Sequence, residues 1–151
     1  MNLSQNLTLE EVTKSSTANR LNIDNTNMTV DVLENLKSLA ENVFQPARDQ
    51  LGPIRVSSGY RSPELNKAIG GAITSQHSKG EALDLQGINF ENSKLFGYIK
   101  DNLEFDQLIW EFGDDDNPDW VHVSYKKNGE NRNMILKSVK ANGNTVYENW
   151  G

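Results

Sequence analysis

The sequence predicts an α+β fold with a mostly antiparallel sheet and helices packed on one side of it. Apolar residues follow a helical period in the first third of the 151 residues, whereas short strand-like segments dominate the rest. The chain contains no cysteine, which excludes disulfides, thiolate-rich zinc clusters and thiol nucleophiles. Because this length suits one core, we expect a single domain over residues 1–151, with residues 1–28 as a helical arm packed on it.

Helix signals come first along the chain. Thr8 is placed to cap a short helix over residues 8–15, and residues 16–25 read as a turn and loop. A longer helix begins after Thr29, is interrupted at Pro46, where a kink is expected, and ends at Gly52. Its apolar face follows three- and four-residue steps and consists of Val32, Leu33, Leu36, Leu39, Ala40, Val43 and Phe44.

Strand signals dominate the remainder. Alternating or β-branched segments predict strands over residues 54–57, 82–85, 105–112, 120–125 and 133–139. Two helices interrupt them, a short one over residues 62–70 and a longer one over residues 89–102. Asn142-Gly143 favours a hairpin turn into a last strand around residues 145–147.

The charge balance limits the partners. Lys and Arg number 15 and Asp and Glu 21, so the formal net charge is −6, and neither a polybasic run nor a basic helical stripe occurs. We therefore expect no binding to nucleic acid. The polar start lacks a basic segment followed by an apolar block, so we expect neither a signal peptide nor membrane insertion.

Two histidines, His77 and His122, are the most informative residues. His77 precedes an apolar strand in which Asp84 faces away from two leucines, and His122 alternates with two valines on another strand. Two imidazoles and one carboxylate on neighbouring strands would suit a catalytic zinc, which takes three protein ligands and leaves a position for water. Hydrogen-bonded core histidines are the alternative interpretation of the same spacing.

An acidic turn precedes His122. Asp119 lies three residues before this histidine and could accept a proton from the attacking water, although the run over residues 114–119 also resembles a solvated acidic turn. The run lacks the spaced glycine and terminal glutamate of an EF-hand loop, which argues against calcium. A non-peptidase hydrolase built on this turn is a further alternative, which the pairing of both histidines disfavours.

Several of these residues together resemble a known family. The pattern is Ser75-x-His77-x-x-Gly80-x-Ala82-x-Asp84, followed by Asp119-Trp120-x-His122 and preceded by Gly59-Tyr60-Arg61-Ser62. It resembles the zinc D-alanyl-D-alanine carboxypeptidases, a family that includes D-Ala-D-Ala dipeptidases and phage endolysins. The opening segment over residues 9–15 and the predicted helix over residues 29–51 resemble the small phage-type subgroup of this family. The resemblance implies a fold like that of these DD-peptidases and of hedgehog domains, in which the sheet carries the zinc site.

The resemblance also implies roles, residue by residue. His77, Asp84 and His122 would be the Zn²⁺ ligands, and Asp119 the general base. Arg61 would contact the substrate and stabilise the oxyanion, and Ser75 would bind substrate or support a ligand. Glu111, at the end of a predicted strand, is the alternative carboxylate for the base.

The implied activity is hydrolysis of peptidoglycan stem peptides, as D-Ala-D-Ala carboxypeptidase or endolysin. Such an enzyme would be made in the cytoplasm and act on the cell wall after release, or as a virion-associated protein. A non-catalytic zinc-containing binding module on the same scaffold is the alternative. The sequence determines neither the bond that is cut nor the oligomeric state.

Overall fold

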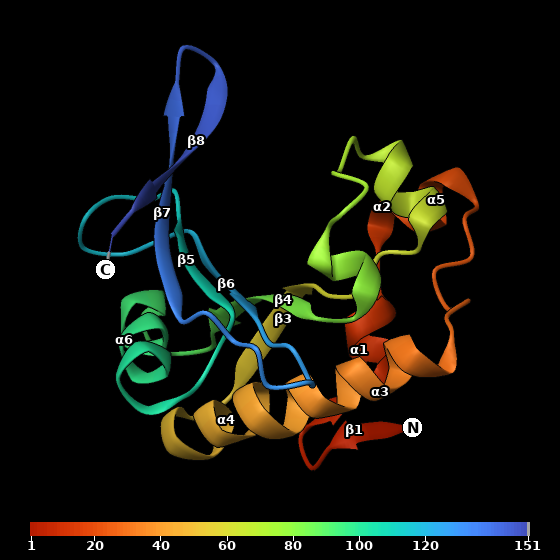
Figure 1. Cartoon of the computed structure of the whole chain (residues 1–151), viewed down its shortest axis with the longest axis horizontal. Coiled ribbons are helices and arrows are strands. Elements are labelled where there is room, and N and C mark those ends of the chain that lie inside the picture. The colour runs from red at the N-terminus through yellow and green to blue at the C-terminus, as the bar shows by residue number, and fades with distance from the viewer. Residues whose placement is uncertain (151) are drawn as a thin grey trace.

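A mixed six-stranded sheet organises the protein (Figure 1). The computed structural model describes residues 1–150. The strands, in sheet order, are β3 (Ile54–Ser58), β4 (Ala82–Gly87), β6 (Trp120–Ser124), β5 (Gln107–Glu111), β7 (Met134–Ala141) and β8 (Asn144–Asn149). Neighbours are antiparallel except β5 and β7, which run parallel. The fold is α+β as predicted, but the sheet is mixed, because the chain leaves β6 and crosses to the other side of β5.

The longest helical stretch covers residues 30–51 and lies along one face of the sheet. It consists of α3 (Val30–Leu39), the π-helical turn η1 (Ala40–Phe44) and α4 (Gln45–Leu51). Thr29 caps it, as predicted, by accepting a hydrogen bond from the Val32 N–H. The wide turn directly precedes Pro46, which has no N–H to donate to the previous turn. The chain therefore accommodates the proline through a π-helical turn.

The core lies between these helices and one face of the sheet. The helix α6 (Asn92–Asn102) covers the same face, and its Leu95, Phe96 and Ile99 are buried. Strand residues at alternating positions complete the core, namely Leu83, Leu85, Leu108, Trp110, Val121 and Val123. Because side chains alternate along a strand, the residues between them face the opposite side of the sheet. That opposite side carries Asp84, His122 and Glu111.

The N-terminal segment contains more regular structure than predicted. Short strands β1 (Asn2–Ser4) and β2 (Leu7–Thr8) precede α1 (Leu9–Thr13), and α2 (Ser16–Leu21) occupies the stretch expected to be turn and loop. Thr8 caps α1 as predicted, within a reciprocal capping box with Glu11. Helix α2 has its own cap at Ser15, which accepts from the Ala18 N–H.

Two short helices lie between β3 and β4. Helix α5 (Pro63–Ala68) follows the predicted cap at Ser62, and η2 (Gln76–Lys79) is a 3₁₀ turn where the sequence indicated only a polar loop. Asn142 and Gly143 both have positive φ, which is the conformation of the predicted hairpin turn between β7 and β8. Within residues 1–150, none of the helices combines the length and apolar character needed to cross a bilayer.

Candidate metal centre

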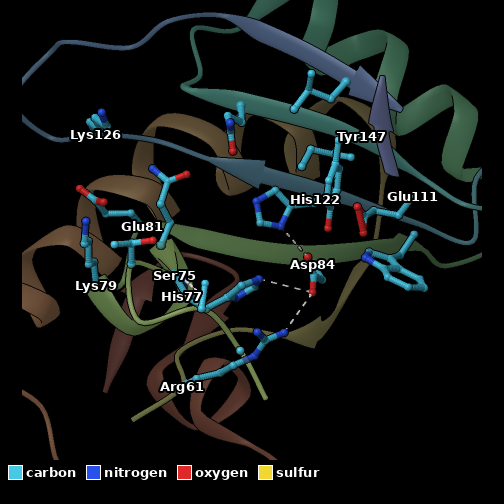
Figure 2. Close-up of a pocket in the computed structure, with 18 of the residues that line it drawn as sticks. Arg61, Ser75, His77, Lys79, Glu81, Asp84, Glu111, His122, Lys126 and Tyr147 are labelled. Atoms are coloured by element: carbon cyan, nitrogen blue, oxygen red, sulfur yellow. Dashed lines mark hydrogen bonds and ion pairs between the residues drawn. The ribbon is translucent and has the colours of Figure 1, made fainter. Parts of the chain in front are cut away.

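Three side chains from distant parts of the sequence meet on the exposed side of the sheet (Figure 2). His77 comes from η2, Asp84 from β4 and His122 from β6, and their potential ligand atoms all lie within 4.8 Å of one another. Asp84 and His122 are direct partners in the antiparallel register of β4 and β6. His122 Nδ1 lies 2.9 Å from Asp84 Oδ1, and His77 Nε2 lies 3.5 Å from Asp84 Oδ2.

The backbone fixes the orientation of His77. Its Nδ1 lies 2.8 Å from the carbonyl oxygen of Gly59. Since a carbonyl oxygen only accepts, Nδ1 carries the proton and donates it, which leaves the Nε2 lone pair directed toward Asp84. Ser75 caps the 3₁₀ turn by accepting from the His77 N–H at 3.3 Å, and Gly80 ends it with a φ of 72°.

Gly59 sits against helix α1 and has no room for a side chain. A Cβ at this position would collide with the carbonyl oxygen of Val12. The next residue, Tyr60, donates its N–H to the same oxygen at 2.7 Å. Close backbone packing thus holds the carbonyl that orients His77.

Asp84 is the anionic centre of the site. Burial works to raise its pKa, but the nearby imidazoles of His122 and His77 outweigh burial and hold the pKa of this carboxyl well below its usual range. Burial lowers the pKa of His77, against the attraction of Asp84, and so favours the neutral imidazole. An ionised carboxylate beside a neutral imidazole is the protonation state that a metal ligand set requires.

A cavity of about 690 Å³ opens over these groups, and Arg61 and Ser75 line it together with the three donors. Arg61 Nη2 lies 3.8 Å from Asp84 Oδ2, and its backbone N–H donates to the His77 carbonyl at 3.2 Å. Buried Asn25 fixes the same segment, because its side chain bonds the Tyr60 carbonyl at 2.9 Å and the Ser62 N–H at 2.8 Å. Nothing in the sequence patterns had singled out this asparagine.

The two candidate bases occupy different places. Glu111 is buried at the end of β5, lines the cavity and is the register partner of Trp120. Burial raises its pKa, and Asp84 raises it further while His122 opposes both. Asp119 is exposed just before β6 and is not among the described residues that line the cavity. The catalytic role of Asp119 therefore stays a prediction drawn from the resemblance.

A second buried carboxylate, which the sequence analysis did not identify, supports the site from one end. Asp106 receives Arg132 Nε at 2.9 Å and Nη2 at 2.8 Å, and Gln76 Nε2 at 3.0 Å. Gln76 immediately precedes His77, so this network reaches the backbone that carries a candidate ligand. In the sequence, the position of Gln76 directly before His77 was the one available signal for this network.

The residues fit a metal by the chemistry of their donors. Two imidazole nitrogens and one carboxylate oxygen, with one imidazole oriented by a second hydrogen bond, are a donor set that catalytic zinc sites use. An arginine and a buried glutamate line the same cavity. This arrangement is typical of metal-dependent hydrolases.

Comparison with known families identifies the class further. Residues 5–124 match the family model described as Peptidase M15, so the chain belongs to the Peptidase M15 family. This confirms the family that the sequence motifs indicated, and it implies a metallopeptidase. No curated protein matches the chain.

Proposed function

We propose that this chain is a zinc-dependent peptidase that hydrolyses stem peptides of bacterial peptidoglycan, as a D-Ala-D-Ala carboxypeptidase or an endolysin. The observation that carries the proposal is the convergence of His77, Asp84 and His122 within 4.8 Å in a chain of the Peptidase M15 family. Arg61 and the buried carboxylate of Glu111 also line this cavity, so it offers a positive charge for the oxyanion and a candidate base.

His77, Asp84 and His122 would hold the zinc ion. Zinc in such a site acts as a Lewis acid, which polarises the scissile carbonyl and makes the attacking water more acidic. Because Nδ1 of His77 donates to the Gly59 carbonyl, Nε2 of His77 would be the nitrogen that binds the zinc ion. The antiparallel register keeps Asp84 and His122 side by side on the floor of the cavity.

Arg61 supplies positive charge next to the reacting bond. Its guanidinium is always protonated and presents a planar fork of donors, which suits either the oxyanion that forms during attack or a terminal carboxylate of the peptide. The side chain is 22% exposed, so it lies partly shielded from water. Ser75 lines the same wall, where its hydroxyl would contact the substrate or brace the His77 turn.

Two carboxylates are candidates for the base, and we propose Asp119, the residue that the family resemblance indicates. Asp119 is exposed directly before β6, three residues before His122. As the base it would take a proton from the attacking water and deliver it to the leaving amine. Glu111 is the alternative, because its carboxylate is buried in the cavity wall, on the same face of the sheet as His122.

Metal analysis combined with zymography tests the function. We expect about one zinc per chain, clearing of purified cell walls by the parent protein, loss of clearing with a chelator and its return with zinc. His77→Ala should lose both bound zinc and clearing. Bound zinc without clearing would identify the non-catalytic module instead, and mass spectrometry of the digested fragments would identify the bond that is cut.

Paired variants test the assignment of the base. We expect Asp119→Asn to keep its zinc and lose turnover by roughly 100-fold or more, the usual scale of a lost general base. Glu111→Gln and the exposed control Glu104→Gln should stay within a few-fold of the parent. The reverse result, with Glu111→Gln inactive and Asp119→Asn active, would reassign the base to Glu111.

A further inference from the structure

The cavity extends past the candidate metal centre toward the last hairpin. In the sheet register, Asp84 pairs with His122, His122 with Ile109, and Ile109 with Leu136. These four residues form one row across the sheet, polar on β4 and β6 and apolar on β5 and β7. Ile109 and Leu136 both line the cavity, so its floor turns apolar next to the metal-binding donors.

Strand β8 adds a tyrosine to this end. Glu111 pairs with Ser138 across β5 and β7, and Ser138 pairs with Tyr147 across β7 and β8. Tyr147 lines the cavity, and in Figure 2 its side chain points into it beside Glu111. The hairpin therefore places the Tyr147 phenol in the row of Glu111 and Ser138, which lies next to the row that contains Asp84 and His122.

Trp150 fixes the hairpin in place, although every residue of β8 is exposed. Trp150 directly follows the last residue of β8 and packs on the core side of the sheet, edge-on against Trp110 at 4.7 Å and near Phe96 at 6.0 Å between ring centroids. Lys137 Nζ lies 4.8 Å from the centroid of the Trp150 ring, and the Trp150 N–H donates to Ile135 at 2.9 Å. Tyr147 is thus presented from an anchored strand.

The Tyr147 hydroxyl is available to a ligand. Within residues 1–150, no group forms a hydrogen bond with it, and the residue is 55% exposed. Burial and the negative charges of Glu111 and Asp84 raise its pKa, so the phenol remains protonated at neutral pH. A protonated phenol next to an apolar floor can donate a hydrogen bond to an acceptor on a bound ligand.

We propose that the β7–β8 hairpin builds a substrate subsite in which Tyr147 donates a hydrogen bond to a peptide carbonyl while Ile109 and Leu136 receive an uncharged, apolar side chain of the same peptide. The proposal rests on the proposed peptidase function and extends it. Leu136 and Tyr147 lie beyond residue 124, outside the stretch that matches the family, so family membership assigns them no role. The subsite thus combines residues of the β7–β8 hairpin with Ile109 of β5.

Steady-state kinetics on muropeptides released from purified walls by a glycosidase test the subsite. Tyr147→Phe removes only the hydroxyl, and we expect KM to rise about 3- to 10-fold, the scale of one neutral hydrogen bond, with kcat changed less than two-fold. Leu136→Asn should raise KM by at least as much, because it places a polar group under the apolar side chain. Val146→Ala, on the same strand with its side chain on the opposite face, and Tyr98→Phe, on α6, should match the parent.

A binding measurement separates this inference from the proposed function. If the parent cleaves and Tyr147→Phe keeps the parent's KM, the subsite is wrong while the function stands. If the parent does not cleave, the same muropeptides are titrated into the zinc-loaded protein and followed by NMR. Shifts at the amides of residues 136 and 147 that weaken in Tyr147→Phe support the subsite, and their absence overturns it.

Discussion

Asp84 and Asp106 are both buried aspartates of the same sheet region, 8% and 0% exposed, yet their surroundings differ in kind. Asp106 is bonded by both arms of Arg132, by the Arg132 N–H at 3.2 Å and by Gln76. Asp84 has two imidazoles at 2.9 and 3.5 Å and a more distant guanidinium at 3.8 Å. The first carboxylate is closed on all sides, and the second faces a cavity.

The difference shows how one residue type serves two purposes. A permanently charged, bidentate arginine saturates the oxygens of Asp106 and makes it a structural link. Imidazole nitrogens can themselves bind a metal, and the oxygens of Asp84 face the cavity, so the whole group remains available to a cation. We therefore expect variants at Asp84 to lose function, and variants at Asp106 to lose stability.

Replacing Asp84 has the largest expected effect. Asp84→Ala removes one of three candidate ligands and leaves two imidazoles that bind zinc weakly. Bound zinc should fall from about one per chain to a small fraction, and wall hydrolysis should fall roughly 1,000-fold or more. Metal analysis and a turbidity assay on purified walls measure both. Retained zinc with lost hydrolysis would mean that Asp84 is catalytic without being a ligand.

Replacing Asp106 should act on stability. Asp106→Asn leaves Arg132 without its anionic partner, and we expect a loss of about 2–4 kcal/mol in unfolding free energy, somewhat below a fully buried pair because Arg132 is half exposed and regains water. Urea denaturation in the presence of a chelator measures this. Zinc content at neutral pH should stay at the parent's level, and a loss of zinc as large as in Asp84→Ala would contradict the separation of the two sites.

The pH dependence of stability should also reflect the ion pair between Asp106 and Arg132. The Arg132 guanidinium lowers the pKa of Asp106 from 3.8 to about 2. A carboxyl whose folded pKa is depressed stabilises the fold above the unfolded pKa, and this contribution, about 2 kcal/mol here, disappears as the pH falls from about 4 to 2. The unfolding free energy of the parent should therefore fall by about that much more than that of Asp106→Asn over this range. Equal slopes for the two proteins would refute the depressed pKa.

The smallest effect concerns Gln76, which connects the two regions. Gln76→Leu removes one hydrogen bond to Asp106, and we expect a loss of about 1 kcal/mol in stability. The zinc dissociation constant should rise a few-fold, because the backbone next to His77 becomes less constrained. A competition assay with a chromogenic chelator measures the second effect. The exposed control Gln50→Leu should change neither quantity.

The sequence predicted the local elements of the fold better than their pairing. The cap at Thr8, the turn at Asn142 and Gly143 and the strand that carries Asp84 all depend on neighbouring residues, and each occurs as predicted. The parallel pairing of β5 and β7 depends on where the chain goes after β6. Alternation identifies a strand but not its partner, so a mostly antiparallel sheet was the default expectation.

The same distinction applies to the site. His77, Asp84, His122 and Arg61 were chosen from motif patterns, and they lie together. The family resemblance indicates Asp119 as the base, with Glu111 as the alternative carboxylate. The two-residue strand period puts Glu111 beside Trp120 and His122 on the cavity face, whereas Asp119 precedes the strand. Tyr147 was missed because its place depends on three successive strand pairings.

The tight contact between Gly59 and Val12 couples the first helix to the donor atoms. The Gly59 carbonyl orients His77 on one side, and the Gly59–Tyr60 backbone rests against Val12 on the other. If zinc binds as proposed, detachment of α1 and release of the zinc ion should be thermodynamically linked, so that each favours the other. Zinc should accordingly slow hydrogen exchange at the amides of residues 9–13, which lie far along the sequence from His77, the first candidate ligand, and proteolytic loss of this helix should weaken retention of the metal.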